Sequence, residues 1–181
     1  ANVDVDLTDC TFEACHYIWQ GITLQEDVKV SSYGKCVFKD ATWAINSHSG
    51  SDFYLNKCDF TNNIFGISAV IETPFPEGNF TITHCNFNFS GVLKASYPTQ
   101  IPIGTHPTAG IYMENRHGII GSNKYSANTF FNLNTGIQLI NSTIQIYNAS
   151  FEAIHTDGIS TLEYMGSAIY TNDELGVSQT T

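Results

Sequence analysis

The chain has 181 residues, of which 42% are hydrophobic and 13% are charged, and its formal net charge is −10. A chain of this length can bury one core of its own. Its seven Lys and Arg residues do not supply the clustered positive charge that nucleic acid and anionic membranes require of a partner, and no apolar run approaches the roughly 20 residues of a membrane-spanning helix.

In place of charge the sequence carries Asn, Thr, Ser, Ile, Phe and Tyr. β-Branched and aromatic side chains fit the pleated, half-buried surface of a sheet. The usual helix formers are scarce, and Arg116 is the single arginine. The composition therefore predicts an all-β protein, with no nucleic-acid partner and no membrane insertion.

A Cys-x-Phe motif recurs in chain order and sets the period of the sequence. Its aromatic residues are Phe12, Phe38, Phe60, Phe87, Phe130 and Phe151, and the residues two positions earlier are Cys10, Cys36, Cys58, Cys85, Asn128 and Ala149. A short alternating run precedes each aromatic residue: Val3/Val5/Leu7, Val28/Val30, Phe53/Leu55, Phe80/Ile82, a weak run at Tyr125, and Ile144/Ile146. A third run, often opened by Gly, follows at Gly21-Ile22, Ala44-Ile45, Gly66-Ile67, Gly110-Ile111, Gly136-Ile137 and Ala168-Ile169.

Each repeat thus holds three short strands within about 21 to 27 residues, apart from insertions. A strand type that recurs once per repeat pairs in parallel with its own copies, and the rest of each repeat supplies the crossover that parallel strands need. The sequence predicts an all-β, right-handed parallel β-helix (a solenoid) of about six three-stranded coils. We expect a single domain over residues 1–172 and a polar tail over 173–181.

The segment "NTFFNLNTGIQL" at 128–139 is similar to the Asn-x-Phe…Gly-Ile coil of β-helix repeats in large secreted bacterial proteins. The chain as a whole resembles the pectate-lyase-like superfamily. This resemblance implies a segment of a secreted or surface-exposed bacterial protein. It is a resemblance of fold pattern and carries no catalytic signature.

Cys and Phe at alternate positions of one strand both point inward, so stacking the coils about 4.8 Å apart should form an internal ladder of each. We expect Cys10, Cys36, Cys58 and Cys85 to be buried thiols that act as small apolar groups. A disulfide or a metal ladder is the alternative. Parallel Cβ vectors disfavour the disulfide, and the sequence lacks the paired Cys-x-x-Cys spacing of a metal site.

Two long insertions, at 90–109 and 155–167, interrupt the period between the second and third strands. The gap from Phe to Ile is seven residues in three coils, but 24 in the fourth coil and 18 in the sixth. Both loops should leave the same corner, about 10 Å apart. Aromatic, imidazole and carboxylate side chains there suit sugar binding, and the predicted ligand-binding residues are Trp19, Tyr97, His106, His155, Asp157 and Tyr164. Alternatively, the loops only cover the side of the coils.

The stretch "HTDGIS" at 155–160 resembles the Asn-Thr-Asp-Gly strand of β-helical polygalacturonases, whose Asp is catalytic. The match implies Asp157 as the catalytic acid. Inverting hydrolysis needs a second carboxyl group nearby, and only Glu163 could form such a pair with Asp157. His155 stands in place of the Asn, and the Asp-Asp pair and Gly-His-Gly expected after this motif are missing. An enzyme is therefore the alternative hypothesis, and no catalytic residue is assigned in the main one.

We expect no cofactor and no metal. The alternative is a calcium ion at the first coil, held by acidic residues there: Asp4, Asp6, Asp9 and Asp27. The predicted function is a non-catalytic scaffold, adhesion or glycan-contact module outside the cell or on its surface. Expected partners are a polysaccharide, another surface protein, or further coils or domains of a longer parent chain, since no capping helix precedes the first strand run.

Overall fold

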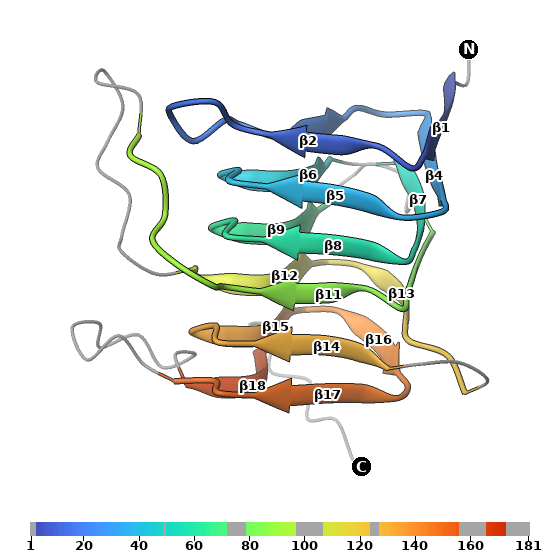
Figure 1. Ribbon diagram of the computed structural model, residues 1–181. Coiled ribbons are helices and arrows are strands. Elements are labelled where there is room, and N and C mark those ends of the chain that lie inside the picture. Colours follow the sequence, from blue (N-terminus) through green and yellow to red (C-terminus); the bar gives the residue numbers. More distant parts are fainter. Residues whose placement is uncertain are drawn as a thin grey trace.

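The computed structural model describes residues 3–48, 50–71, 79–96, 107–123, 127–155 and 166–172. These residues form eighteen short strands that wind into a single stack of coils (Figure 1). Within the described residues no helix is long and apolar enough to cross a membrane. The predictions for 97–106, 156–165 and 173–181 lie outside the described residues.

Every third strand along the chain belongs to the same sheet, so the fold consists of three parallel sheets of six strands. The first sheet contains β1 (Val3–Thr8), β4 (Val28–Tyr33), β7 (Asp52–Asn56), β10 (Phe80–Thr83), β13 (His117–Ile120) and β16 (Thr143–Ile146). The second contains β2 (Thr11–Glu13), β5 (Cys36–Lys39), β8 (Cys58–Thr61), β11 (Asn86–Asn88), β14 (Asn128–Phe131) and β17 (Ala149–Glu152). The third contains β3 (Ile22–Leu24), β6 (Trp43–Ser47), β9 (Phe65–Val70), β12 (Ala109–Glu114), β15 (Thr135–Ile140) and β18 (Ser167–Asn172).

The chain is therefore a parallel β-helix of six three-stranded coils, as predicted, and it winds in a right-handed sense (Figure 1). Coil one contains β1 to β3, and coil six contains β16 to β18. The predicted alignment of the second strands is confirmed, because the six motif Phe residues pair in one register from coil to coil.

The rings of these Phe residues form a continuous stack through the core. Successive ring centroids are between 4.7 and 5.3 Å apart, and the planes are within 13° of parallel. The spacing matches the distance between neighbouring strands, so each ring rests on the ring of the next coil. The repeated Phe of the sequence is the aromatic axis of the core.

Glycine precedes the third strand's apolar residues because the Phe stack lies against the backbone there. A Cβ on Gly66 would lie 2.6 Å from the Phe87 ring, and one on Gly110 would lie 2.8 Å from the Phe130 ring. Distances this short require the ring or the backbone to move. Glycine at this position therefore leaves room for the neighbouring aromatic ring.

The corners explain the high content of Asn and Asp. Among the described residues, eleven other than glycine adopt a positive φ, between 45° and 63°, and most of them are Asn or Asp, whose short polar side chains tolerate this conformation. They sit between strands, and examples from the three corners are Asn148, Asn62 and Asn141. Turning the chain within one or two residues keeps successive coils in register.

Two sequence-based assignments are corrected. The fifth strand of the first sheet is β13, whereas the sequence placed it near Tyr125. Gly118 occupies an inward position of β13, where a Cβ would lie 2.5 Å from the Phe80 ring. Because glycine stands there in place of an apolar residue, the sequence of β13 lacks the alternating apolar pattern of a strand. Of the four ladder thiols, three are fully buried, but Cys10 is only half-buried because coil one has no described coil beyond it.

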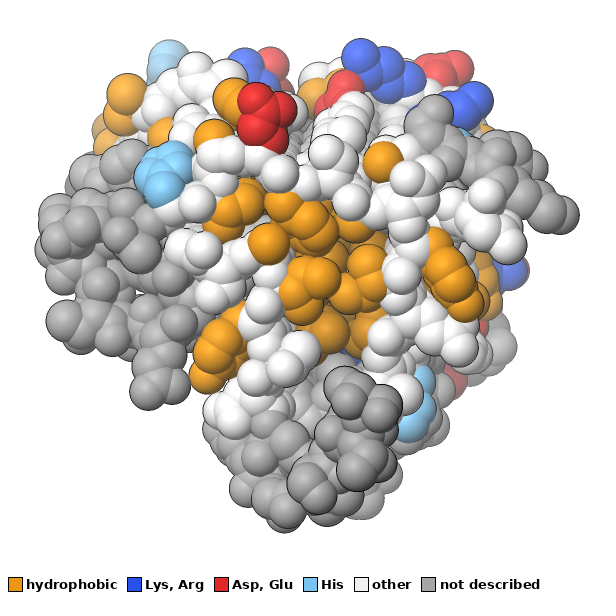
Figure 2. All heavy atoms as spheres, turned by 90° about the horizontal axis from the view of Figure 1, so that it is seen from below, with side chains coloured by type: hydrophobic (Ala, Val, Ile, Leu, Met, Phe, Trp, Pro, Cys, Tyr) orange, Lys and Arg blue, Asp and Glu red, His pale blue; other side chains and the backbone are white. Residues whose placement is uncertain are grey.

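Both ends of the stack expose residues that are buried in the middle. Figure 2 shows the coil-six end, where apolar side chains gather at the centre of the face. Ile169 is 43% exposed, whereas Ile137, its partner on the preceding coil, is fully buried. At the other end Val5 is 38% exposed. The inward-facing columns thus run uncovered to both end coils of the described structure.

Candidate functional site

A groove crosses the outer face of the first sheet over coils two to four. It has a volume of about 340 Å³, and we call it the sheet groove. Its lining residues are Lys29, Ser31, Ser32, Tyr33, Tyr54, Leu55, Asn56, Thr81 and Thr83. The set combines two tyrosines, one cation, four aliphatic hydroxyls and an amide, and it contains no carboxylate.

Two tyrosine side chains supply the aromatic surface of the sheet groove. Tyr33 is 57% exposed and Tyr54 is 37% exposed. The ammonium of Lys29 lies 5.3 Å from the centroid of the Tyr54 ring, in the range of a cation–π contact. This contact holds a positive charge next to the groove and positions the Tyr54 ring.

Hydrogen bonds orient the polar side of the same groove. The amide oxygen of Asn56 accepts a hydrogen bond from the Thr83 hydroxyl at 3.3 Å and one from Nδ1 of His84 at 2.7 Å. Its backbone N–H donates to the Ser32 hydroxyl at 2.7 Å. Asn56 is thereby fixed between coils two and four, with its amide in a defined orientation.

The sheet groove was missed at the sequence level because its residues depend on strand register. Lys29 and Tyr54 both line the groove, but they are not partners in the sheet, because Lys29 pairs with Asp52 and Tyr54 pairs with Ser31. On the third sheet, by contrast, one row of outward residues runs in register from Thr23 on coil one to Tyr170 on coil six. Continuing the alternation of β4 from Lys29 through Ser31 would have indicated that Tyr33 faces outward.

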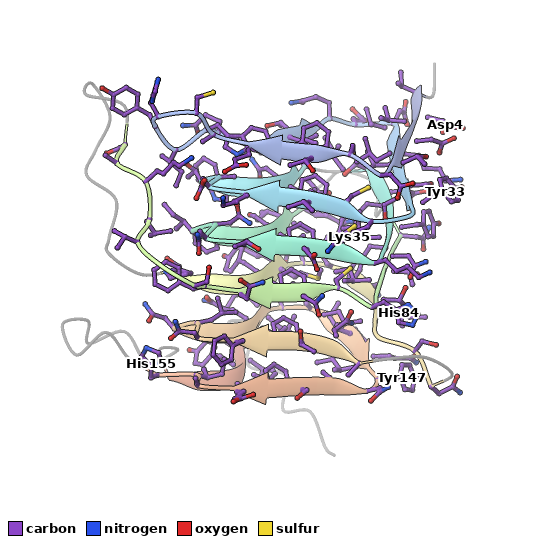
Figure 3. All side chains as sticks on the ribbon, viewed as in Figure 1. Asp4, Tyr33, Lys35, His84, Tyr147 and His155 are labelled. Atoms are coloured by element: carbon purple, nitrogen blue, oxygen red, sulfur yellow. The ribbon has the colours of Figure 1, made fainter. Side chains whose placement is uncertain are left out.

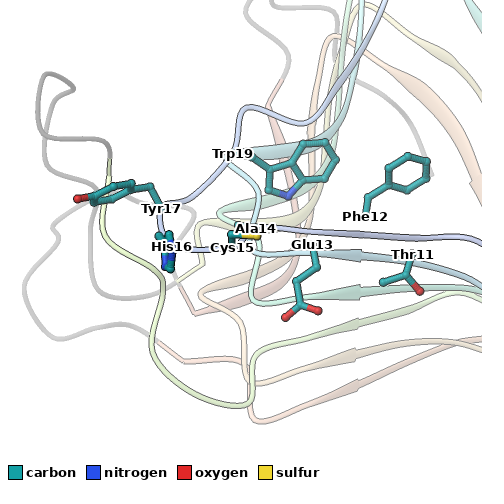
Figure 4. A pocket seen from close by; sticks show the side chains of 8 residues that line it. All are labelled: Thr11, Phe12, Glu13, Ala14, Cys15, His16, Tyr17 and Trp19. Carbon is teal, nitrogen blue, oxygen red and sulfur yellow. The ribbon is translucent and has the colours of Figure 1, made fainter.

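The predicted ligand-binding corner contains a second hollow at coil one, about 580 Å³ in volume (Figure 4). Tyr17 and His16 project from the outer end of this turn, and Trp19 and Phe12 lie toward the coils (Figure 4). Trp19 is half-buried, stacks on Phe12 at 6.1 Å and donates its indole N–H to the Lys39 carbonyl at 2.8 Å. Trp19 therefore packs as part of coil one as well as lining the hollow.

The described members of the predicted ligand set do not lie together. Trp19 is on coil one, while His155 follows β17 on coil six, about 24 Å away at 4.8 Å per coil. His155 is exposed on the opposite side of the stack from Tyr33 (Figure 3), and its Nδ1 is 2.7 Å from the Ala153 carbonyl. The other members, Tyr97, His106, Asp157 and Tyr164, lie outside the described residues, as does Glu163.

The chain that follows β11, residues 89–96, includes the start of the coil-four insertion and runs back along the corner to coil one, and we call it the strap (Figure 1). The backbone N–H of Ile18 donates to the Ala95 carbonyl at 3.0 Å. Lys94 forms an ion pair with Asp40 at 2.8 Å and donates to the Ala14 carbonyl. The strap thus brings the chain next to Trp19 two residues before Tyr97.

The thiol ladder is reduced and tightly packed. All five cysteines are free. The sulfur atoms of Cys10 and Cys36 are 3.4 Å apart, and burial together with this contact raises the pKa of Cys10 to about 11. Burial also raises the pKa of Cys85 well above its usual value. These neutral thiols behave as core groups.

No group of three or more His, Cys, Asp or Glu side chains within the described ranges is placed to hold a metal ion. Among the acidic residues of coil one, Asp9 accepts a hydrogen bond from the Lys35 backbone at 2.8 Å through its carboxylate. Its carboxylate therefore caps the backbone of the next coil.

The single arginine is a core residue. Arg116 is fully buried, and its guanidinium lies 5.7 Å from the Phe53 ring centroid and 5.6 Å from that of Phe80. One of its nitrogens donates to the Ser51 carbonyl at 3.2 Å. Arg116 therefore packs inside the corner before β13 and is remote from the outer surface.

Comparison of the chain with protein-family models, with curated proteins and with solved structures gave no match.

Proposed function

We propose that the chain is a non-catalytic β-helical segment of an extracellular or cell-surface protein, which acts as a scaffold and contacts glycans through the sheet groove. The observation that carries this proposal is the pairing of Tyr33 and Tyr54 with the polar row formed by Asn56 and Thr83 on one rigid sheet. Sites on strands hold their side chains more rigidly than sites on loops.

The chemistry of the sheet groove suits a sugar. A pyranose ring presents an apolar face of C–H groups that stacks on an aromatic ring, and its hydroxyls pair with amides and hydroxyls. Lys29 adds a positive charge, which would favour an acidic sugar over a neutral one. Two aromatic rings beside a small number of polar groups, each held in one orientation, are suited to the recognition of a small ligand.

The extracellular setting rests on the resemblance of the repeats to those of secreted bacterial proteins and of the pectate-lyase-like superfamily. Further coils of a longer parent chain, or another surface protein, are proposed as partners on the same ground. The alternative of a glycoside hydrolase requires Asp157 and Glu163. Both residues lie outside the described part of the chain, so no contact described above favours it.

The test is a glycan array followed by calorimetry with the full chain. We expect binding to acidic or neutral polysaccharide without cleavage, and Tyr33→Ala and Tyr54→Ala should each weaken it about tenfold, the loss of one stacking contact. Tyr147→Ala is the matched control, since Tyr147 is 41% exposed on coil six and its hydroxyl bonds Gln145.

The outcomes separate the hypotheses. Loss of binding in Tyr17→Ala but not in Tyr33→Ala would move the contact to the corner hollow. Cleavage of the polysaccharide that disappears in Asp157→Asn would replace the scaffold with the hydrolase. Absence of binding to every glycan on the array would contradict glycan contact by this segment.

A further inference from the structure

We propose that the open end of coil six docks onto coil one of a second copy of this chain, so that copies stack head to tail. The proposal rests on the two end coils and is independent of the sheet groove, and it takes a second copy, in place of further coils of a parent chain, as the occupant of the coil-six face. Its basis is the contact already made five times within the chain, in which each coil covers the inward-facing residues of the coil before it.

The two ends present matching inward columns. Phe151 ends the Phe stack that Phe12 begins, and both rings are half-buried. In the same way Ile169 ends the third-sheet column that begins at Ile22, and Ile146 ends the first-sheet column that begins at Leu7. A second copy placed one strand spacing beyond coil six would therefore set ring on ring and aliphatic on aliphatic.

The backbone geometry also matches at the two ends. β16, β17 and β18 are the last strands of their sheets, and β1, β2 and β3 are the first. Because all pairing is parallel and each sheet keeps its place around the coil, the three edges of coil six fit the three edges of coil one in one orientation. Exposed strand edges are the usual template for pairing with another chain.

Charge selects head-to-tail contact over head-to-head contact. The exposed outer positions of coil one are acidic, with Asp4 and Asp6 on β1 and Glu13 on β2. Two coil-one ends would bring these carboxylates against one another. On coil six the outer positions of β16 are Thr143 and Gln145, which are neutral, so a coil-one end meets no repulsion along that sheet. Along the second sheet Glu152 of β17 would meet Glu13, whose carboxylate already forms an ion pair with Lys39 at 2.6 Å.

The experiment measures the mass of the full chain by sedimentation as its concentration rises. Species larger than a dimer should appear, because a heterologous contact leaves an open end on every assembly. Ile169→Lys should weaken association at least about tenfold, as expected for a central apolar contact. Ile119→Lys is the matched control, since Ile119 is 37% exposed on the outer face of β13.

A mixing experiment tests the polarity of the contact. Val5→Lys blocks coil one and Ile169→Lys blocks coil six, so each variant alone should be monomeric at concentrations at which the wild-type chain just associates. When the two variants are mixed, the free coil-six end of Val5→Lys can bind the free coil-one end of Ile169→Lys. The mixture should contain a one-to-one dimer and no larger species. Thermal unfolding of each variant checks that its fold is intact. We expect an intact fold because both Val5 and Ile169 are exposed.

Three results would overturn the proposal. A wild-type chain that stays monomeric over the whole concentration range would show that neither end receives a copy. A dimer that Ile169→Lys abolishes and Val5→Lys preserves would show contact between two coil-six ends. Equal loss of association in the Ile119→Lys control would show that the end faces are not the interface.

Discussion

The rings of Phe60 and Phe87 stack with their centroids 4.7 Å apart and their planes 3° from parallel. Phe60 also stacks on Phe38 at 5.0 Å, so it has an aromatic neighbour on both sides. Its side chain is 2% exposed. Phe60 is therefore a central member of the aromatic axis of the core.

Replacing this ring tests the stack. Phe60→Ala should lower the free energy of unfolding by about 3 to 5 kcal/mol, through lost burial and the cavity left between the neighbouring rings. Denaturant unfolding measures the change. Phe131→Ala removes a ring that is 42% exposed on the adjacent position of β14, and it should cost much less. A loss below about 1 kcal/mol for Phe60→Ala would contradict the stack as a source of stability.

The glycine column offers a second test. Gly66→Val should destabilise the fold by about 1 to 3 kcal/mol, because the new side chain meets the Phe87 ring and the Gly110 carbonyl. Ala44 occupies the same position on coil two, so a single methyl fits there and the larger side chain is the informative one. Gly91→Val, where no atom lies within 4 Å, is the control. Equal stability of the two variants would show that the column has no steric role.

Thiol reactivity should follow burial and pKa. At pH 8 a thiol reagent should modify the exposed Cys15 first, whereas Cys36, Cys58 and Cys85 should react only on unfolding. Cys10 should react slowly although it is half-buried, because its pKa of about 11 leaves little thiolate, and its rate should rise with pH. Mass spectrometry of unreduced protein that shows disulfides among the ladder thiols would contradict these expectations.

The same pKa shift predicts a pH dependence of stability. The Cys10 pKa is raised from 9.0 to about 11 in the folded chain, so above pH 9 the unfolded thiol ionises first. The unfolded state then binds fewer protons than the folded state, and the free energy of unfolding should fall between about pH 9 and pH 11. Cys10→Ser should make this fall smaller. An unchanged slope in that variant would assign the pH dependence to other groups.

The strap can be tested through its ion pair. Lys94→Met leaves the 2%-exposed carboxylate of Asp40 without its cation and should cost about 3 kcal/mol, as for other buried pairs. Lys35→Met is the control, because Lys35 is 70% exposed in its pair with Asp59 and its loss should cost below about 1 kcal/mol. Similar effects of the two substitutions would mean that the strap contact adds nothing to stability.

The sequence predicts the coils because their signal is periodic. Phe38, Phe60 and Phe87 repeat at the same place in each coil, and any chain that keeps this register must pair in parallel. β13 escaped prediction because Gly118 and Arg116 replace the apolar alternation there, and their packing against Phe80 is visible only in three dimensions.

Sites are harder to predict than coils for a physical reason. The sheet groove joins Tyr33, Tyr54 and Thr83 from three coils. Which of these side chains are neighbours depends on the pairing register of the strands, which the sequence does not give. The strap has no period at all, so nothing in the sequence indicates that Lys94 reaches Asp40. Of the predicted ligand-binding residues, Trp19 lies on coil one and His155 lies on coil six, and the others are not among the residues that the structure describes.

A solenoid in which each coil contacts only its neighbours would melt from its ends, one coil at a time. The strap changes this, because Lys94 bonds Ala14 across 80 residues of sequence and ties coil one to the chain that leaves coil four. Coil one cannot fray without first releasing the strap, so the first four coils should open in hydrogen exchange as a single cooperative unit. The last two coils, which the described strap does not reach, should exchange earlier and independently.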